Sequence, residues 1–486
     1  MLRWVVALVL HVGAISAGEY YIDAASGRDA NPGTSPSRAW ATLSRINSTT
    51  FQPGDRILLR AGSAWTGQLW PKGSGIAGRP IVIDRYDQGA NPAIHGAGAL
   101  EDAVKLYNQE FWEIRNIEVT NTGATAAVRR GIHLILDNYG TARDVVVSHV
   151  EVHDVNGALN LKDTGGIVWS IHGEKRPSRF DGLTIEHSYI HKVDRTGIAG
   201  QSSHWMRKSW FPSLHVRIRG NTVEDSGGDG IVPWACDGLQ VEFNVAKGCN
   251  QRSDGFNAGV WSWSSDNSVF QYNEAYLTRG TRDGEGFDSD YNSRNAIFQH
   301  NYSHDNEGGF MLICNDGHHK RDINAGNVGT IVRNNLSQDD AVRSFHVVGP
   351  VQGTRIHGNE IHSNTGKQLN VVQISDWEGW PEDTELARNR FRVSGSALCV
   401  HAIGRTPDGL YQTAPGMGPG VRTQFLRNLF QVARTDCPTE YPNGGAGESG
   451  LAGAPLEEFA REAIGLRSPE QRHTAWKRFL QVKFGN

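Results

Sequence analysis

The sequence predicts an all-β fold, a right-handed parallel β-helix solenoid of about ten coils, from three observations. A short phrase, with a large apolar residue three positions before an asparagine, recurs along the chain. The asparagines of its clear copies are spaced 23 to 34 residues apart. Convincing helical periodicity is absent from about residue 110 to about residue 375. A repeat of this kind cannot bury its own apolar face, so successive repeats must stack on one another.

The repeated phrase occurs six times in clear form. The copies are Ile218-Arg-Gly-Asn221, Val241-Glu-Phe-Asn244, Phe270-Gln-Tyr-Asn273, Phe298-Gln-His-Asn301, Val332-Arg-Asn-Asn335 and Ile356-His-Gly-Asn359. Equivalent residues in stacked coils lie about 4.8 Å apart. An asparagine at the same corner of each coil can therefore hydrogen-bond to the next one and satisfy backbone groups in a buried bend. We interpret these asparagines as structural.

The flanking sequence suggests five segments. Weaker copies of the phrase begin at Ile114 and continue to Asn428, which assigns residues 101–435 to the β-helix. Residues 19–100 form an N-terminal cap and the first coils. Within the cap we expect a short helix, capped by Ser37, with Trp40 among its apolar residues. Residues 436–453 are a glycine-rich linker. Residues 454–486 form a helical tail, whose second helix starts at a capping box from Ser468.

The first 18 residues have the pattern of a secretion signal. A positive start precedes a short apolar run and then small residues. The run is too short to span a membrane, and no later run is long enough. We therefore expect a signal peptide at residues 1–18 and a secreted protein, extracellular or periplasmic, with no membrane span. We also expect a monomer.

The net charge and the cysteines bear on the expected partners and disulfide bonds. The net charge is −4, and no basic stripe indicates a nucleic-acid partner. Five cysteines in an exported chain leave at least one unpaired. Cys236 and Cys249 fall in consecutive coils and are one expected pair, and Cys399 with Cys437 is the other. Cys314 is then left over, in an apolar strand where a buried free thiol is common.

The repeats over residues 19–435 resemble the large family of right-handed β-helix repeat proteins. That family includes pectate-lyase-like lyases and polygalacturonase-like hydrolases. The cap resembles the N-terminal cap of secreted β-helix carbohydrate enzymes, notably at Asp29-Ala-Asn-Pro-Gly-Thr-Ser-Pro36 and Phe51-Gln-Pro-Gly-Asp-Arg-Ile-Leu-Leu59. The resemblance implies a carbohydrate-active enzyme. One fold hosts many functions, so the chemistry has to be sought in specific side chains.

Acidic residues recur at one position of successive coils. Asp229, Asp254 and Glu285 each stand two places before an apolar residue, and Glu307 stands three places before one. If those apolar residues stack inside the solenoid, Asp229, Asp254 and Glu285 form a vertical column. Stacked carboxylates repel one another, so they raise each other's pKa or hold a cation. Either outcome suits a functional site.

The densest acidic segment is Arg282-Asp-Gly-Glu285-Gly-Phe-Asp288-Ser-Asp290-Tyr291. With Phe287 inward, Asp288 and Asp290 face the same outer side. Glycoside hydrolysis needs two carboxyl groups, which lie about 6.5–9.5 Å apart in inverting enzymes. We predict an inverting pair, with Asp288 or Asp290 as the base and Glu285, Glu307 or Asp229 as the acid. The full set of predicted catalytic residues is Asp288, Asp290, Glu285, Glu307, Asp229 and Asp254.

Aromatic residues gather in the same coils. A tryptophan with an exposed face can stack on a sugar ring. The predicted substrate-binding residues are Trp234, Trp261, Trp263, Tyr291, Arg282 and His318. Trp261 and Trp263 alternate with serines and share a face, with Val260 inward. We expect a shallow groove across the coils, walled by the loops at 201–212 and 315–327.

Three functions remain open, and the preferred one is a secreted glycoside hydrolase that degrades a polysaccharide. The first alternative is a lyase that cleaves a uronic-acid glycan by β-elimination, with Ca²⁺ bound at the acidic column. Lysine is scarce in the relevant coils, which disfavours it. The second alternative is a non-catalytic glycan-binding solenoid, which would not need four acids in adjacent coils. No cofactor is required by the preferred reading, and no residue is assigned as a metal ligand.

Overall fold

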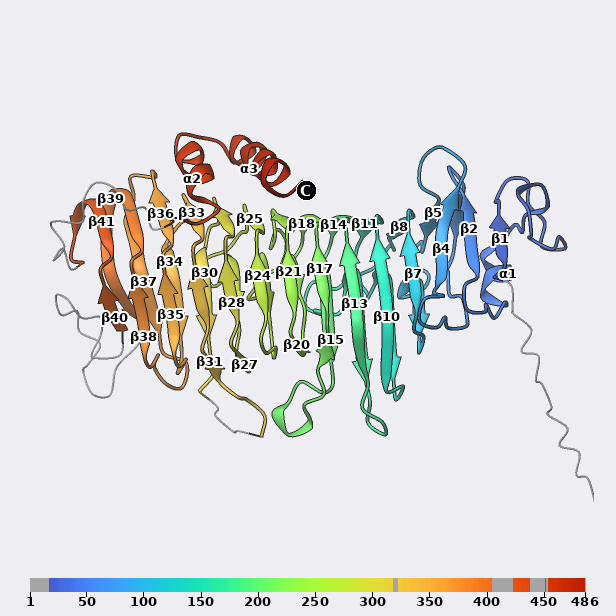
Figure 1. Ribbon diagram of the computed structural model, residues 1–486, viewed down its shortest axis with the longest axis horizontal. Coiled ribbons are helices and arrows are strands. Elements are labelled where there is room, and N and C mark those ends of the chain that lie inside the picture. Colours follow the sequence, from blue (N-terminus) through green and yellow to red (C-terminus); the bar gives the residue numbers. More distant parts are fainter. Residues whose placement is uncertain (1–16, 318–321, 404–422, 438–450, 452, 486) are drawn as a thin grey trace, which may run out of the picture.

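A computed structural model describes residues 17–317, 322–403, 423–437, 451 and 453–485. The chain winds into a solenoid whose coils stack along the long axis of the molecule (Figure 1). Most coils contribute one strand to each of three faces, and named strands pair in parallel with the strands one coil before and after. The predicted all-β solenoid is confirmed. The expected signal segment at residues 1–18 falls almost wholly outside the described residues.

The first face is a continuous parallel sheet that runs the length of the solenoid. Its strands are β1 (Glu19–Ile22), β2 (Arg56–Arg60), β4 (Ile81–Tyr86), β7 (Trp112–Arg115), β10 (Thr141–Ser148), β13 (Arg179–Glu186), β17 (Arg217–Arg219), β21 (Gln240–Glu242), β24 (Val269–Gln271), β28 (Ile297–Gln299), β32 (Ile331–Arg333), β35 (Thr354–His357), β38 (Thr384–Ala387) and β40 (Thr423–Leu426). Short strands beside it are β16 (Ser213–Leu214), β20 (Cys236–Asp237), β27 (Ser293–Arg294) and β31 (Asn327–Val328).

The second face follows the first after a tight corner in each coil. Its strands are β3 (Ala64–Thr66), β5 (Ala93–His95), β8 (Glu118–Asn121), β11 (Glu151–Val155), β14 (Tyr189–Val193), β18 (Thr222–Ser226), β22 (Val245–Lys247), β25 (Glu274–Tyr276), β29 (Tyr302–His304), β33 (Leu336–Gln338), β36 (Glu360–Ser363) and β41 (Leu429–Thr435). The long strand β39 (Arg390–Ile403) pairs with β36 at its start and with a third-face strand at its end.

The third face carries the candidate site. Its strands are β6 (Asp102–Tyr107), β9 (Arg130–Asp137), β12 (Gly165–His172), β15 (Thr196–Ser202), β19 (Ile231–Val232), β23 (Val260–Ser262), β26 (Glu285–Ser289), β30 (Gly309–Cys314), β34 (Arg343–Val348) and β37 (Leu369–Ser375). The register places Val260 beside Phe287, and Phe287 beside Met311. These three side chains point into the core, so the residues that follow them point outward.

The asparagine ladder occupies the corner between the first and second faces, as predicted. The main-chain N–H and the Nδ2 of Asn221 both donate to Oδ1 of Asn244, at 3.0 Å. The Nδ2 of Asn244 also donates to the carbonyl of Ile218, the apolar residue of the preceding phrase. The ladder runs through Asn221, Asn244, Asn273, Asn301, Asn335, Asn359, Asn389 and Asn428. The phrase recurs because the asparagine of each coil accepts hydrogen bonds from the bend of the coil before it.

The ladder also tolerates an unfavourable backbone conformation. The residue before each asparagine has positive φ, and most of these residues are not glycine; Tyr272 and His300 both have φ of 57°. The left-handed region is unfavourable for residues with a Cβ. Hydrogen bonds on both sides of the corner fix this conformation. Upstream of Asn221 the ladder passes to Ser188, whose N–H donates to Asn221 Oδ1 and whose hydroxyl accepts from Val150.

The two ends differ in how they cover the core. At the N-terminus, helix α1 (Leu43–Asn47) follows a short 3-10 turn at Pro36–Arg38, and Trp40 is buried as expected. The cap of α1 is Thr42, not the predicted Ser37, because Ser37 lies in the 3-10 turn and the chain is extended at Ala39 and again at Thr42. Trp40 therefore lies outside the helix, where it pairs with Ile22.

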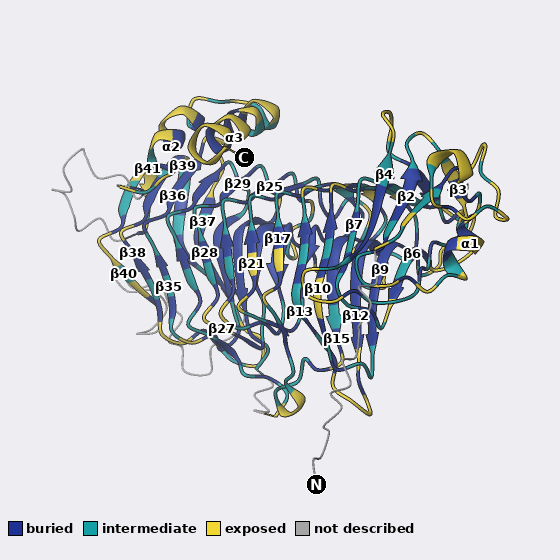
Figure 2. Cartoon of the chain, turned by 45° about the vertical axis from the view of Figure 1, so that its right-hand side comes forward, coloured by how far each residue is buried: buried dark blue, intermediate teal, exposed yellow. Residues whose placement is uncertain are grey.

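The C-terminal helices lie against the second face and do not close an end of the solenoid (Figure 1). Helices α2 (Glu457–Ala463) and α3 (Pro469–Phe484) are present as predicted, and Ser468 and Gln471 form the capping box of α3. Phe459 and Trp476 pack on Tyr302 of β29. Figure 2 shows the outward surfaces of both helices as exposed, above strands that are largely buried. The tail therefore covers apolar side chains of the middle coils.

The cysteines only partly follow the predicted pairing. Cys399 and Cys437 form the expected disulfide, and Cys314 is free and buried as expected. Cys236 and Cys249 are both free, so their predicted bond is wrong. Cys236 lies in β20 beside the first face, whereas Cys249 follows β22 of the second face. No helix among the described residues is long and apolar enough to cross a membrane.

Candidate functional site

A cavity of about 530 Å³ opens on the third face over strands β23, β26, β30 and β34. The strands supply Trp261, Asp288, Leu312, Cys314, His346 and Val348. Loops between strands supply the walls, from Lys162, Phe256, Asn257, Ala258, Arg282, Asp283, Asp290, Tyr291, Asp376 and Trp377. Three carboxyl groups of one segment, those of Asp283, Asp288 and Asp290, thus share a single cavity. We call it the carboxylate pocket.

The outward direction of strand β26 accounts for two of these acids. Phe287 is fully buried in the core, so Asp288 points to the pocket, and Asp290 follows just beyond the strand. Oδ1 of Asp290 accepts hydrogen bonds from the main-chain N–H of Tyr291 at 2.7 Å and from the thiol of Cys314 at 2.8 Å. Asp288, in contrast, is 4% exposed, and its Oδ1 has no hydrogen-bond partner among the described residues.

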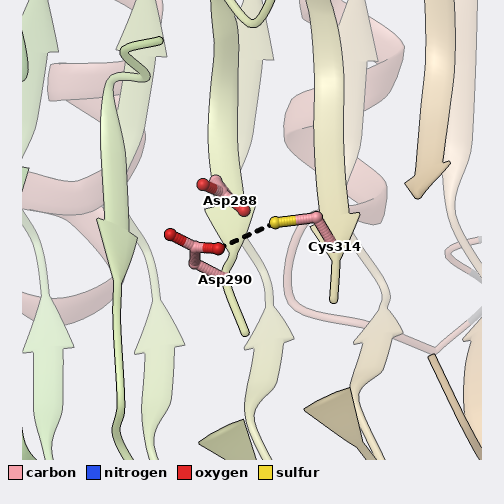
Figure 3. A group of neighbouring side chains, drawn as sticks. All are labelled: Asp288, Asp290 and Cys314. Carbon is pink, nitrogen blue, oxygen red and sulfur yellow. Dashed lines mark hydrogen bonds between the residues drawn. The ribbon is translucent and has the colours of Figure 1, made fainter. Parts of the chain in front are cut away.

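Figure 3 shows Asp288, Asp290 and Cys314 together, with the thiol of Cys314 directed at the Asp290 carboxylate. One ligand atom from each of the three residues lies within 4.8 Å of the other two. Cys314 comes from the neighbouring coil, on strand β30. The stacking of β30 on β26 therefore creates a contact between residues 24 positions apart in sequence.

The three clustered carboxyl groups of Asp283, Asp288 and Asp290 have raised pKa values. Burial raises the pKa of Asp283 well above its ordinary value, and the charges of Glu285 and Asp290 add to the effect. Burial also raises the pKa of Asp288 well above its ordinary value, helped by Asp290 and Asp283. Burial raises the pKa of Asp290 to about 6, against the hydrogen bonds from Cys314 and Tyr291. Clustered acids with raised pKa values are typical of functional sites.

Glu285 lies behind the pocket and is neutralised by a cation. Its side chain is fully buried, and Nη2 of Arg343 lies 2.6 Å from its Oε1. His346 lies 3.3 Å from the same oxygen. Burial acts to raise the pKa of Glu285, but Arg343 and His346 outweigh it and hold this pKa below its ordinary value. Glu285 is therefore an ionised, paired group and a poor proton donor.

Asp229 is likewise committed to partners. Its Oδ2 lies 2.8 Å from Nη1 of Arg195 and 3.4 Å from Nζ of Lys162. Its Oδ1 accepts from the indole N–H of Trp261 at 3.0 Å. Asp229 does not line the carboxylate pocket but holds Lys162 and Trp261, which do.

The predicted acidic column does not form as expected, because one coil was aligned in the wrong register. Ile231 stacks on Val260, not on Phe256, and Phe256 is 61% exposed at the pocket wall. The position equivalent to Asp229 and Glu285 is therefore Ala258. Asp254 lies four residues earlier, exposed and outside the pocket lining. A cation site built on Asp229, Asp254 and Glu285 has no geometric basis.

Glu307 is separate from the other predicted acids. It lines a second cavity of about 340 Å³, together with Glu224, Asp225, Lys247, Arg279 and Asp305 among others. Its carboxylate accepts a hydrogen bond from the main-chain N–H of Gly280 at 2.8 Å. Glu307 shares no lining with the carboxylate pocket.

The predicted aromatic residues form one connected group beside the pocket. Trp263 contacts Trp234, Trp205 and Tyr291, with ring centroids 4.6, 4.7 and 5.4 Å apart. Tyr291 in turn contacts Trp377, which is 39% exposed. Trp261, Tyr291 and Arg282 line the pocket, whereas Trp234 and Trp263 lie outside its lining. His318 lies outside the described residues. The loop at 201–212 and the described part of 315–327 contribute no lining residue.

Several pocket residues were missed from the sequence. Lys162 lies in a loop before β12, yet its Nζ sits 4.4 Å from the centre of the Trp261 ring. Trp377 follows β37, three coils beyond β26. Asp283 lies in the acidic segment described above but is not among the predicted catalytic residues. Its place two residues before Glu285 was the available signal; Lys162 and Trp377 carry no local signal.

Comparisons with known proteins agree with this architecture. A family model described as a right handed beta helix region matches residues 175–328. A lacto-N-biosidase of Bifidobacterium longum subsp. longum is 26% identical over 453 residues, and the match covers 73% of this chain. It covers 28% of the relative, so the chain spans less than a third of that protein's length.

Two solved structures of a lacto-N-biosidase of glycoside hydrolase family GH136 from Eubacterium ramulus are also similar. The selenomethionine derivative has a TM-score of 0.64 and the native protein one of 0.63, each at 22% sequence identity. Each match covers 85% of this chain and 68% of the other. Likeness at this level establishes the fold. With the stacked parallel strands and the asparagine ladder, it identifies the chain as a right-handed parallel β-helix.

Proposed function

We propose that this protein is a glycoside hydrolase that cleaves a glycan bound in the carboxylate pocket. The observation that carries the proposal is the meeting of Asp283, Asp288 and Asp290 in one cavity with exposed aromatic walls. Glycoside hydrolysis needs one carboxyl group that donates a proton and one that is ionised. The similarity to proteins named lacto-N-biosidases supports this class of reaction.

Hydrogen bonding and exposure support an assignment of the two roles. Asp290 accepts two hydrogen bonds at one oxygen, which favours its ionised form, so we give it the role of base or nucleophile. Asp283 is the proton donor in this proposal, because it is the more exposed of the two remaining acids and lies on a loop at the pocket wall. Asp288 is more deeply buried, and its raised pKa favours the protonated form.

The stereochemical outcome depends on which pair acts. Inversion, predicted from the sequence, requires carboxyl groups about 6.5–9.5 Å apart with water between them. Asp288 and Asp290 have oxygens within 4.8 Å of each other, too close for that arrangement. Inversion therefore stays a prediction for Asp283 with Asp290. Proton NMR of the first-formed product anomer checks it, and a retained anomer would mean that a closely spaced pair is at work.

Aromatic and charged side chains would bind the sugar. Trp377 and Phe256 are exposed on the pocket lining, and Trp261 and Tyr291 present further rings there. Aromatic rings of this kind suit the apolar faces of sugars. We assign Arg282, whose guanidinium lies 5.7 Å from the centre of the Phe256 ring, to the same binding role. Trp263 packs against Tyr291, and Trp234 packs against Trp263.

One observation favours the lyase alternative. Lys162 reaches the carboxylate pocket, where a basic group could abstract a proton from a uronic acid. However, its Nζ forms an ion pair with the buried carboxylate of Asp229 at 3.4 Å, so it is already engaged and not directed at a substrate. Ca²⁺ at the acidic column loses its support with the corrected register. The binding-only alternative leaves the three clustered acids without a purpose.

The decisive experiment is product analysis on a panel of neutral and acidic polysaccharides together with a lacto-N-bioside. Reducing ends and the ultraviolet absorbance of unsaturated uronates are both read, with and without EDTA. We expect reducing ends without absorbance, unaffected by EDTA and reduced about 100-fold or more in Asp290→Asn and in Asp283→Asn. Asp254→Asn, an exposed acid outside the pocket, is the matched control and should keep full activity.

Other outcomes would point elsewhere. Absorbance that rises with the reducing ends, and that is lost in Lys162→Met, would make the protein a lyase. Binding of a glycan without any product would favour the glycan-binding alternative. A secreted location and a monomeric state stay predictions, which cell fractionation and light scattering can check.

A further inference from the structure

The group formed by Asp288, Asp290 and Cys314 has the composition of a site for a soft divalent cation. One atom from each residue lies within 4.8 Å of the other two. Bonds from Zn²⁺ to carboxylate oxygen and thiolate sulfur are roughly 2.0–2.3 Å long, so two such bonds span nearly that separation. A small side-chain rotation would bring all three atoms onto one ion. The group is empty in this structure.

A buried atom without a partner points independently to a ligand at this place. Asp288 is 4% exposed, and its Oδ1 makes no hydrogen bond with any residue that the structure describes. Buried polar atoms in folded proteins are nearly always paired, so an unpaired one needs an explanation. The carboxyl group sits beside the contact between Cys314 and Asp290 (Figure 3). A cation held by those two residues would lie within reach of Asp288.

The surroundings allow an ion to enter and to be retained. All three residues line the carboxylate pocket, which gives a path from solvent. The sulfur ligand selects the metal, because thiolates favour Zn²⁺ and its heavier analogue Cd²⁺ over Ca²⁺ and Mg²⁺. Three protein ligands leave a further coordination position for water.

We propose that Asp288, Asp290 and Cys314 form an inhibitory site for Zn²⁺ or Cd²⁺ inside the carboxylate pocket. On binding, the metal displaces the thiol proton of Cys314 and the carboxyl proton of Asp288, both of which pass to solvent. The metal bonds to sulfur and to one oxygen of each aspartate. The ion then occupies the lone pairs of Asp290 that the reaction needs. The inhibitory part of this inference rests on the proposed function; the binding part does not.

The first test needs no glycan. Cd²⁺ is titrated into the full-length, EDTA-treated protein, and the ultraviolet charge-transfer band of cadmium–thiolate bonds is recorded. We expect one Cd²⁺ per chain with a saturable band. The band should disappear in Cys314→Ser, and Asp288→Asn should weaken binding at least tenfold. Zn²⁺ should compete for the site, whereas Ca²⁺ and Mg²⁺ should not.

Matched controls separate this site from the other thiols. Cys236→Ser replaces a buried thiol that donates to the carbonyl of Trp234 and does not line the carboxylate pocket, and it should leave the band unchanged. Circular dichroism confirms that each variant folds. In addition, alkylation of Cys314, mapped by mass spectrometry, should slow when Zn²⁺ is present. A band that survives in Cys314→Ser, or Cd²⁺ binding with no band in the wild type, would overturn the proposal.

The two proposals fail separately. If hydrolysis is found and Zn²⁺ does not reduce it, the inhibitory site is refuted and the hydrolase stands. If the Cys314-dependent band is found but no glycan is cleaved, the metal site stands and the hydrolase does not. If both hold, Zn²⁺ should suppress hydrolysis in the wild type, EDTA should restore it, and Cys314→Ser should be at least tenfold less sensitive.

Discussion

Arg343 and Glu285 form an ion pair in the wall behind the carboxylate pocket, with 2.6 Å between Nη2 and Oε1. Their side chains are 3% and 0% exposed, so water does not screen the pair. Arg343 also donates to the carbonyls of Thr281, Arg282 and Asp283. One guanidinium thus fixes both the buried carboxylate and the loop that carries Asp283.

Replacing Arg343 with methionine should destabilise the protein strongly. Removal of one partner leaves a buried charge without compensation, which costs about 3–5 kcal/mol. We expect a clear fall in the melting temperature by calorimetry, partly recovered in the double variant Arg343→Met/Glu285→Gln. Arg282→Met is the control, because this exposed arginine makes no ion pair with a described residue. An Arg343→Met variant as stable as the wild type would show that the pair contributes little.

The buried carboxyl of Asp340 should make stability depend on pH. Burial raises its pKa to about 7, against hydrogen bonds from Ser303, Ser337 and Asn306, whereas the ordinary value is 3.8. Between these values the folded protein holds a proton that the unfolded chain has lost. Stability therefore falls by about 1.4 kcal/mol per pH unit as the pH rises through this window.

Asp340→Asn removes that dependence and keeps an amide oxygen for Asn306. The variant should melt above the wild type at pH 8, and the difference should shrink toward pH 4. Melting curves across this range check the effect. Asp383→Asn, which changes an exposed carboxylate, should shift the curve little at any pH. A difference between wild type and Asp340→Asn that does not vary with pH would contradict the assigned pKa.

Alanine substitution of a ladder asparagine should destabilise the protein more in the middle of the ladder than at its end. Asn301→Ala removes hydrogen bonds to Asn273, Phe270 and Asn335 and leaves buried groups unpaired. We expect the free energy of unfolding to fall by about 3 kcal/mol. Asn428→Ala, at the last rung among the described residues, removes three such bonds instead of four and should cost less. Equal losses in denaturant unfolding would argue against cooperative support between rungs.

Arg472 should hold the C-terminal helices on the second face. Its guanidinium is paired with Asp305, at 2.7 Å, and with Asp339. Arg472→Met should leave Asp339 without an ion-pair partner among the described residues and Asp305 with only the neighbouring His304. Amide hydrogen exchange in α3 should therefore speed up by about tenfold or more, equivalent to about 1.4 kcal/mol. Lys477→Met, on the exposed side of α3, should leave exchange unchanged. Exchange that rises equally over the whole chain would indicate general unfolding instead.

Sequence spacing was sufficient for the fold and for the direction of strand β26. The phrase that ends at each ladder asparagine spans only four residues, so its structural role can be inferred from the sequence of a single coil. Alternation after Phe287 correctly placed Asp288 and Asp290 on one outer side. The alignment of Asp254 failed because Phe256 and Val260 are both apolar and only four residues apart. Only the paired strands show which of them enters the core.

The rest of the pocket depends on stacking between coils, which local patterns do not encode. The contact between Cys314 and Asp290 requires the register of β30 on β26. Lys162 and Trp377 come from loops of coils on either side, and neither loop carries a repeat. The pairing of Cys236 with Cys249 was wrong for a related reason, since residues in consecutive coils can lie on different faces.

The asparagine corner allows the loops of the solenoid to vary in length. Successive rungs are separated by as few as 23 residues, between Asn221 and Asn244, and as many as 39, between Asn389 and Asn428. The bond from rung to rung is nevertheless the same. The asparagine corner therefore stays the same while the loops between successive rungs differ in length. Loops such as those bearing Phe256 and Trp377 could be exchanged to admit a different sugar while the scaffold beneath them stays intact.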